Sequence, residues 1–523
     1  MSSHSYTQNG AWEVYFPAPH FFLSGCDFMS LINVSNLTFC YDGSYDNVFE
    51  SVSFQLDTDW RLGLVGRNGR GKTTFLNLLQ GKYEYQGNIS ASVCFDYFPF
   101  PVADKSQNTM EIIESLDPEL ESWRIYKELA ALEVDYDVLY RPFSTLSGGE
   151  QTKVLLSTLF LREGNFLLID EPTNHLDLEG RRVVSRYLSR KKGFILVSHD
   201  RAFLDSCTDH ILSINKMDIQ VTQGNFSTWW QNKELRDAWE RAENDKLKRD
   251  IKRLDAAAKR TANWSDSVES TKYGTRNSGL RPDRGYIGHK AAKMMKRSKA
   301  VESRRQEAVE EKSGLLKNIE TVVDLKLCPL AHPKRKLVEA VNLTVDYGSG
   351  PICKPVSFTV EQGTCVALTG RNGAGKSSLL KLIAGQDLPH AGLLSLVSGL
   401  IISVVPQDSS FLQGDLSEYA ESCGIDESLF KSILRKLDFS RIQFEKDMAD
   451  YSAGQKKKVL LARSLCEEAH LYLWDEPLNY IDIFSRMQIE ALIKEYRPTL
   501  LLVEHDQEFL AGIDAKEVLL ESF

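Results

Sequence analysis

The sequence predicts an α/β protein built from two tandem P-loop domains joined by a long antiparallel two-helix linker. Two glycine-rich loops, at residues 66–73 and 370–377, each follow an apolar strand and precede a helix. Three further motifs recur in the same order at offsets of 305 or 306 residues, which excludes coincidence in practice. Between the copies lies a charged stretch with helical periodicity on both sides of a glycine-rich centre. A chain of 523 residues is also too long for one domain.

Residues 1–28 differ in composition from the rest of the chain, because they are rich in aromatic residues and contain no Lys or Arg. A secretory or transit signal needs a positive start and a clear apolar core, and this segment has neither. We expect it to be a disordered tail or a misassigned start. The first domain is then expected to span residues 29–225.

The first glycine-rich loop runs from Gly66 to Thr73 and matches the P-loop pattern. Its glycines allow backbone amides to surround phosphates, its lysine can contact the terminal phosphate oxygens, and its hydroxyl can bind Mg²⁺. The predicted phosphate-binding residues are Gly66, Asn68, Gly69, Gly71, Lys72, Thr73 and Thr74 in the first copy, and Gly370, Asn372, Gly373, Gly375, Lys376, Ser377 and Ser378 in the second.

Each copy also contains an apolar strand that ends in two acids, Asp170-Glu171 and Asp475-Glu476. The aspartate can hold Mg²⁺, and the glutamate can orient or deprotonate an attacking water. Taken alone, such a strand is more often an ordinary solvated strand end. A later apolar strand in each copy leads to a histidine, His199 or His505, that could sense the terminal phosphate, although a lone histidine is more often structural.

A serine-glycine motif precedes each acidic strand, as Ser147-Gly-Gly-Glu and Ser452-Ala-Gly-Gln. Together the four motifs resemble two ATP-binding cassettes, which would make the fold two tandem ABC ATPase domains. Two cassettes on one chain, with a long basic linker, resemble the ABC-F family of ribosome-associated ATPases. The segments YSAGQKKKVLLARSL, DEPLNYIDIF and HKAAKMMKRSKA are most similar to its Lsa-type and Vga-type antibiotic-resistance branch.

The resemblance implies two composite ATP sites, because cassettes of this kind pair head to tail. Site one would combine the first P-loop with Ser452 and Gly454, and site two would combine the second P-loop with Ser147 and Gly149. Tyr41 and Tyr347 would stack on adenine, unless they are simply tyrosines at strand ends. Glu171, Glu476, His199 and His505 would be catalytic, and the metal ligands would be Thr73, Asp170, Ser377, Gln407 and Asp475.

One position departs from the family pattern. Gln407 fits the family glutamine that touches Mg²⁺ and the attacking water, but the matching position in the first copy is Phe100. A phenyl ring cannot bind a metal, so the two sites could hydrolyse ATP at different rates.

The linker, residues 226–336, has a predicted tip loop at about 267–288 and carries a local excess of positive charge. Sixteen Lys and Arg face five Asp and Glu between Lys246 and Lys299, in a chain of net charge −9. Such a projection can bind RNA phosphates, although charge-rich helices are often only solvated faces. The predicted ribosome and tRNA contacts are Lys272, Tyr273, Arg276, Arg281, Arg284, Tyr286, Lys290, Lys293, Lys296 and Arg297.

Composition favours a cytoplasmic protein. Nine scattered cysteines without a CxxC pair indicate a reducing compartment and no zinc or iron–sulfur ligand set. The longest apolar run, residues 392–405, is too short to cross a bilayer, so no membrane partner is expected. The second domain should span residues 337–523.

The resemblance therefore implies an ATPase that requires ATP and Mg²⁺ and acts as a monomer with its two cassettes paired. It would bind the ribosome at the tRNA exit site, contact large-subunit rRNA and P-site tRNA, and displace lincosamides, pleuromutilins and streptogramin A. One alternative is a general ABC-F translation factor without a drug role. Two others are the ATPase subunit of an ABC transporter, which would not explain the basic hairpin, and a DNA-maintenance ATPase, which normally has very long coiled coils or zinc modules between its cassettes.

Overall fold

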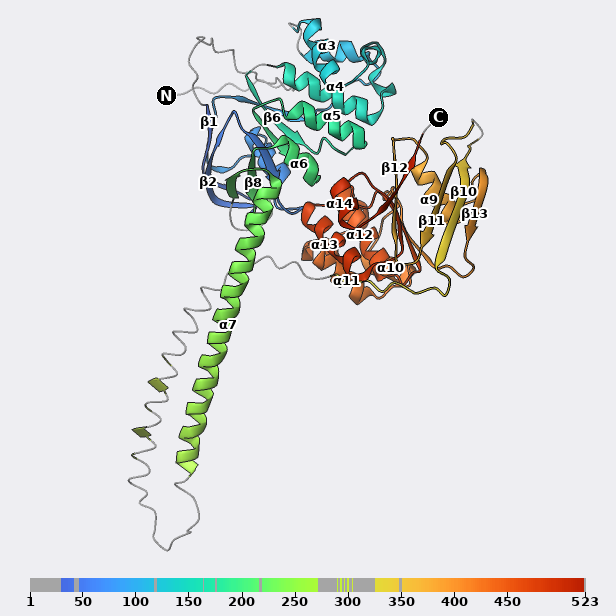
Figure 1. Ribbon diagram of the computed structural model, residues 1–523. Helices are drawn as coiled ribbons and strands as arrows, with labels where there is room; N and C mark the ends of the chain where they lie inside the picture. Colours follow the sequence, from blue (N-terminus) through green and yellow to red (C-terminus); the bar gives the residue numbers. More distant parts are fainter. Residues whose placement is uncertain are drawn as a thin grey trace, which may run out of the picture.

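Two α/β lobes lie side by side in the computed structural model, and one long helix extends away from them (Figure 1). The described residues are 30–41, 47–116, 120–162, 164–174, 176–215, 219–270, 325–347 and 350–521, with isolated positions between 289 and 303. The predicted tail at 1–28 lies outside the described residues, as does the predicted tip loop from residue 271 onward.

A six-stranded sheet of order β5-β6-β7-β3-β8-β9 forms the centre of the first lobe. Its strands are parallel except for the β8–β9 pair. Three of them, β3, β6 and β7, are nearly continuous apolar runs, as expected for strands covered on both faces. The bounds are β3 Arg61–Val65, β5 Cys94–Phe98, β6 Asn165–Asp170, β7 Phe194–Val197, β8 His210–Ile214 and β9 Ile219–Gln223.

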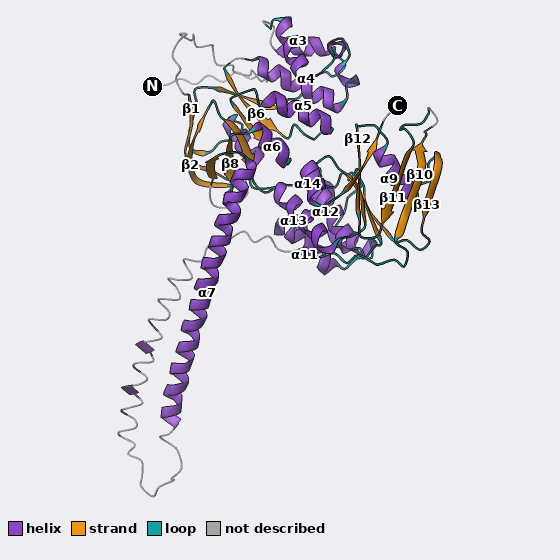
Figure 2. Cartoon of the chain, in the orientation of Figure 1, coloured by secondary structure: helices purple, strands orange, loops and turns teal. Residues whose placement is uncertain are grey.

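A smaller antiparallel sheet and a set of helices complete this lobe (Figure 2). The sheet has the order β2-β1-β4, with β1 Leu31–Phe39, β2 Phe49–Asp57 and β4 Gln86–Ser90. The helices are α1 Lys72–Leu79, α2 Thr109–Leu116, α3 Ser122–Ala131, α4 Gly148–Leu161, α5 Leu178–Leu188 and α6 Arg201–Cys207, with 3-10 turns at Tyr136–Tyr140 and Phe143–Thr145.

The second lobe repeats this plan with a five-stranded parallel sheet of order β14-β15-β16-β12-β17 and a small sheet of order β11-β10-β13. Its strands are β10 Lys336–Val345, β11 Val356–Glu361, β12 Cys365–Gly370, β13 His390–Leu396, β14 Ile402–Val405, β15 Leu471–Asp475, β16 Leu500–Val503 and β17 Lys516–Leu520. Its helices are α9 Lys376–Ile383, α10 Leu416–Ser422, α11 Glu427–Lys436, α12 Ala453–Cys466, α13 Ile483–Tyr496 and α14 Gln507–Gly512, with 3-10 turns at Arg441–Glu445 and Met448–Asp450.

Helix α7, Phe226–Ser270, is 45 residues long and projects from the first lobe (Figure 1). At 1.5 Å per residue it reaches about 68 Å. Its first turn is anchored, because Phe226 and Trp229 belong to the buried core of that lobe. Of the predicted returning helix the structure describes only isolated helical positions, so that helix and the tip loop stay predictions. Among the described helices, none is both long and apolar enough to cross a membrane.

The two lobes share a packed interface. Phe484 of α13 lies in the core cluster of the first lobe, with its ring centroid 5.8 Å from that of Trp230. Arg201 of α6 pairs with Glu490 at 2.8 Å and with Glu508 at 3.3 Å, both in the second lobe. These contacts hold the P-loop of each lobe towards the opposite lobe.

Candidate functional site

Both P-loops join a buried strand to a helix that begins at the lysine. Gly71 and Gly375, immediately before these helices, have φ of 89° and 84°, a left-handed conformation that glycine adopts without strain. Lys72 Nζ donates to the Gly66 carbonyl at 2.8 Å, and Lys376 Nζ donates to the Gly370 carbonyl at the same distance. Burial lowers the pKa of both lysines. Each loop therefore holds a desolvated ammonium group beside a helix N-terminus, an arrangement that suits phosphate.

The hydroxyl and carboxylate predicted to bind a metal lie together in both lobes. Thr73 Oγ1 donates to Asp170 Oδ2 at 3.1 Å, and Ser377 Oγ donates to Asp475 Oδ1 at 3.1 Å. Burial raises the pKa of both aspartates. Hard oxygen ligands of this kind fit Mg²⁺, which prefers one or two protein oxygens together with substrate phosphates.

The two glutamates share an unusual backbone conformation, with φ of 51° at Glu171 and 47° at Glu476. Non-glycine residues rarely adopt positive φ, and such strain concentrates at functional sites. His199 Nε2 lies 3.3 Å from Glu171 Oε1, and His505 Nε2 lies 4.0 Å from Glu476 Oε1. A histidine ring therefore lies near the positive-φ glutamate in both lobes, at a longer distance in the second; a catalytic role for these four residues stays a prediction.

The Glu171 carboxylate is buried without a hydrogen-bond donor among the described residues. The contact with His199 is close, but its geometry is not that of a hydrogen bond. Burial, and then the charge of Asp170, raise the pKa of Glu171 to about 8. Burial also lowers the pKa of His199 well below its usual value, so this ring is neutral at pH 7. An unsatisfied buried acceptor at a site of this kind indicates that a water or ligand completes it.

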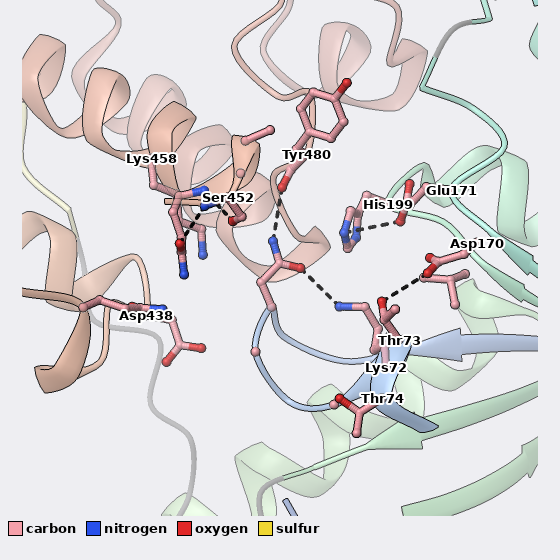
Figure 3. A pocket seen from close by; sticks show the side chains of 18 of the residues that line it. Lys72, Thr73, Thr74, Asp170, Glu171, His199, Asp438, Ser452, Lys458 and Tyr480 are labelled. Atoms are coloured by element: carbon pink, nitrogen blue, oxygen red, sulfur yellow. Dashed lines mark hydrogen bonds and ion pairs between the residues drawn. The ribbon is translucent and has the colours of Figure 1, made fainter. Parts of the chain in front are cut away.

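Site one forms a cavity of about 540 Å³ between the lobes. Figure 3 shows Lys72, Thr73 and Asp170 on one side, with Ser452 and Lys458 on the other. Asn68 Nδ2 donates to the Tyr480 carbonyl across the interface at 3.1 Å. Ser452 caps helix α12 in a reciprocal pair with Gln455, so the N-terminus of α12 faces the first P-loop. Two helix N-termini therefore converge on one cavity.

Ser452 and Gly454 line site one, as the resemblance implied. Tyr41 also lines this cavity, and its hydroxyl lies 2.6 Å from Thr74 Oγ1. A role for Tyr41 in stacking on adenine stays a prediction.

Site two is a cavity of about 450 Å³ built from the second P-loop and the first lobe. Of the first serine-glycine motif, Gly148 lines this cavity, whereas Ser147 and Gly149 do not; Ser147 is exposed and caps α4. Tyr347 donates to Ser378 Oγ at 3.1 Å but lies outside the lining and is 52% exposed. The two cavities are therefore not equivalent.

Gln407 and Phe100 behave differently, as their side chains require. Gln407 Nε2 donates to Glu476 Oε2 at 3.0 Å. Phe100 packs against the core of the first lobe and lines a separate cavity of about 400 Å³. It makes no polar contact at site one, so the departure from the family pattern has a visible structural consequence.

Sequence reasoning missed three residues near the sites. Tyr97 Oη donates to Asp170 Oδ2 at 2.8 Å, but its strand, CFDYF, reads as core. Lys457 Nζ donates to the carbonyls of Pro406, Gln407 and Asp475. Lys458 forms a buried ion pair with Asp482. The run of three lysines entering an apolar helix was a signal for the last two.

Few of the predicted linker contacts can be described. Lys293 and Lys296 are exposed at helical positions. The others lie outside the described residues, namely Lys272, Tyr273, Arg276, Arg281, Arg284, Tyr286, Lys290 and Arg297.

The chain is similar to proteins of known families and folds. The family model described as ABC transporter matches residues 49–174 and 353–479, which contain both P-loops and both acidic strand ends. Ribosome protection protein VmlR of Bacillus subtilis is 27% identical over 497 residues, covering 92% of this chain and 85% of VmlR. Energy-dependent translational throttle protein EttA of Haemophilus influenzae is 25% identical over 521 residues, covering 89% of this chain and 88% of EttA.

A solved structure supports the fold. The crystal structure of the complex of archaeal ribosomal stalk protein aP1 and archaeal ribosome recycling factor aABCE1 aligns with a TM-score of 0.58 at 19% identity, covering 93% of this chain and 90% of that chain. At this identity the similarity concerns the fold alone.

Proposed function

This chain belongs to the ABC-F family of ATPases, with two ABC ATPase domains in tandem, and we propose that it uses ATP to protect ribosomes from antibiotics that bind the peptidyl-transferase centre. The drug classes proposed are lincosamides, pleuromutilins and streptogramin A. The similarity to VmlR over 92% of the chain supports ribosome protection, because that relative is named for it.

The main support for a dependence on ATP is the cavity of site one, which is lined by residues of both lobes. ATP bound there would contact Lys72 and the N-terminus of α1 from one lobe, and Ser452 at the N-terminus of α12 from the other. Both helix N-termini would stabilise the negatively charged phosphates of ATP. The nucleotide would therefore stabilise the paired arrangement of the lobes.

The chemistry of hydrolysis would come from residues at the ends of the central strands. Mg²⁺, when bound by Thr73 and Asp170, supplies positive charge to the phosphate oxygens. Mg²⁺ bound beside Asp170 would lower the pKa of Glu171 again, because a nearby cation favours the carboxylate. Glu171 would then accept a proton from the attacking water, and His199 would stay neutral beside it. A positioned base of this kind contributes about 10²–10⁴ in rate. Glu476, His505, Ser377 and Asp475 would act likewise at site two.

The proposed linker, residues 226–336, would reach the ribosome. Helix α7 is about 68 Å long and projects from the first lobe, and the basic residues that follow it would bind phosphates of large-subunit rRNA and of P-site tRNA at the exit site. Lys293 and Lys296 are exposed, as this role requires. The protein would act in the cytoplasm as a monomer.

A general translation factor of the same family is the second candidate. EttA, named as a translational throttle, matches nearly the same share of the chain as VmlR. Drug susceptibility separates the two functions: a host that expresses the protein should tolerate the three drug classes better only if the chain protects ribosomes.

The first experiment uses the double variant Glu171→Gln, Glu476→Gln, which should bind ATP and remain closed. It is sedimented with ribosomes through a sucrose cushion, with and without ATP. We expect it to pellet with ribosomes only when ATP is present. The matched control, Lys72→Ala, Lys376→Ala, should stay in the supernatant. Intact ATP binding by the glutamate variant without ribosome pelleting would refute a ribosomal function.

A further inference from the structure

Strand β5 lies beside the acidic strand β6, and strand β14 lies beside the acidic strand β15 in the same way, so the two sites can be compared residue by residue. Phe98 of β5 pairs with Ile169, and Val405 of β14 pairs with Trp474. Each of these partners directly precedes the metal-site aspartate. Tyr97 therefore corresponds to Val404, and Phe100 corresponds to Gln407.

Site two is organised around Gln407. Its side chain donates to Glu476, and Asn479 Nδ2 donates to the same carboxylate oxygen at 2.6 Å. Lys457 fixes the backbone that carries Gln407, because its Nζ donates to the Pro406 carbonyl at 2.8 Å and to the Asp475 carbonyl at 3.0 Å. The glutamine is thus tied both to the acidic strand end and to helix α12.

Site one has none of these ties at the matching residues. Phe100 packs against the core, and Thr152, the counterpart of Lys457, donates instead to Gly148 in its own helix at 2.9 Å. The polar contact to the acidic strand end comes from Tyr97, whose Oη donates to Asp170 Oδ2 at 2.8 Å. Thr73 donates to that same oxygen at 3.1 Å. The aliphatic side chain of Val404 offers no such donor at site two.

The Tyr97 ring is itself held in place. It is half-buried beside the core of the first lobe, and Lys82 Nζ lies 5.1 Å from its ring centroid. A hydroxyl on a fixed ring orients the carboxylate that receives it, because a single donor at 2.8 Å restricts rotation about the carboxylate bond. Groups that orient a metal-binding carboxylate affect metal affinity strongly even though they do not touch the metal.

We propose that Tyr97 is a positioning residue for Mg²⁺ binding at site one, where it orients Asp170 in a site that lacks the glutamine. The inference rests on the proposed binding of ATP and Mg²⁺ at site one. At site two Gln407 contacts Glu476 instead, and Val404 offers Asp475 no donor. The two sites then differ in how they hold the metal as well as in sequence.

The test isolates site one with Lys376→Ala and measures Mn²⁺ binding by electron paramagnetic resonance, with a non-hydrolysable ATP analogue present. Tyr97→Phe keeps the ring and removes only the hydroxyl. We expect the dissociation constant for Mn²⁺ to rise about 10–100-fold, while analogue affinity in excess EDTA stays unchanged. The matched control is Tyr126→Phe, which removes a hydroxyl of α3 that contacts Tyr140 of the 3-10 turn Tyr136–Tyr140 on the surface; its Mn²⁺ affinity should equal that of the parent.

Addition of Phe100→Gln to Tyr97→Phe restores at site one the glutamine that is expected to bind the metal at this position, and we expect it to recover part of the lost Mn²⁺ affinity. Unchanged Mn²⁺ affinity in Tyr97→Phe, or an equal loss of metal-free analogue binding, would overturn the inference. A lowered melting temperature with normal Mn²⁺ affinity would also overturn it, since Tyr97 would then be only structural. If the parent with Lys376→Ala binds no Mn²⁺ with the analogue, the proposed metal–nucleotide site itself fails.

Discussion

Replacement of Lys458 by methionine should destabilise the second lobe through a single buried charge. Lys458 Nζ lies 2.8 Å from Asp482 Oδ2, and the side chains are 4% and 1% exposed. Burial alone would raise the pKa of Asp482, but the charge and hydrogen bond of Lys458 hold it well below its usual value. The carboxylate is therefore ionised at pH 7 and depends on its partner. The variant leaves this anion buried without its cation.

Loss of one partner of a buried pair costs about 3–5 kcal/mol. Ser485 still donates to both carboxylate oxygens through its backbone N–H and its hydroxyl, each at 2.9 Å, so we expect a value near 3 kcal/mol, the lower end. For a lobe of this size each kcal/mol lowers Tm by about 2–4 °C, which gives about 6–12 °C. Calorimetric melting without nucleotide at pH 7 measures this shift.

The first lobe supplies the matched control. Lys153 holds the position of Lys458 in α4 but is only partly buried, so Lys153→Met should cost under about 1 kcal/mol. The double variant Lys458→Met, Asp482→Asn should recover most of the loss, because a neutral amide can still cap α13. Equal shifts for the two lysine variants would refute the reasoning.

The pH dependence has a definite sign. In the wild type the depressed pKa of Asp482 contributes stability above the unfolded-state pKa of about 3.9. That stability disappears as pH falls through the folded-state pKa. In Lys458→Met the Asp482 carboxylate has lost its cation, so protonation of Asp482 removes the cost of burying an unpaired anion. The deficit of the variant relative to the wild type should therefore shrink as the pH is lowered from 7 towards 4.

Two further predictions concern packing. Phe484→Ala should weaken docking of the lobes by about 3–5 kcal/mol, because this ring is only 8% exposed and lies within the core of the other lobe. Thermal melting should then separate into two transitions. A single unchanged transition would contradict this prediction. Gly392→Ala should lower the free energy of unfolding by about 1–3 kcal/mol more than Gly399→Ala. Both glycines have positive φ, but a Cβ at Gly392 would lie 2.2 Å from the Asn342 carbonyl oxygen, whereas a Cβ at Gly399 would meet nothing within 4 Å. Urea unfolding measures both variants, and equal stabilities would exclude the close contact as the cause.

The parts of each site that are local in the chain could be predicted from sequence. A P-loop is one strand, one loop and one helix, so its function is written in a single run of residues, and Lys72 and Thr73 lie where that run requires. The repeat then indicated which acidic strand ends belong with which loop. Ser452 and Gly454 were predicted at site one only through the family resemblance, because no local pattern shows which lobe faces which.

Tyr97 shows why the rest could not be predicted. Its role depends on β5 lying beside β6, because Tyr97 and Asp170 are 73 residues apart in the sequence. Within the strand, an alternation of aromatic and polar residues fits a core position equally well. At site two the motif alone did not indicate which of its residues lines the cavity: Gly148 does, and contacts of Ser147 and Gly149 with nucleotide stay predictions.

Phe484 connects three parts of the molecule that sequence treats as independent. It lies two residues after Asp482, so pattern alone assigns it to the second lobe, yet its ring packs against Trp230 at the start of α7. The Arg67 guanidinium of the first P-loop lies 5.6 Å from the same ring centroid, and Lys233 Nζ of α7 lies 5.7 Å from it. Because packed side chains transmit displacement to their neighbours, any change at this P-loop that moves Arg67 also alters the support of α7. The interface thus gives site one a direct physical connection to the projecting helix.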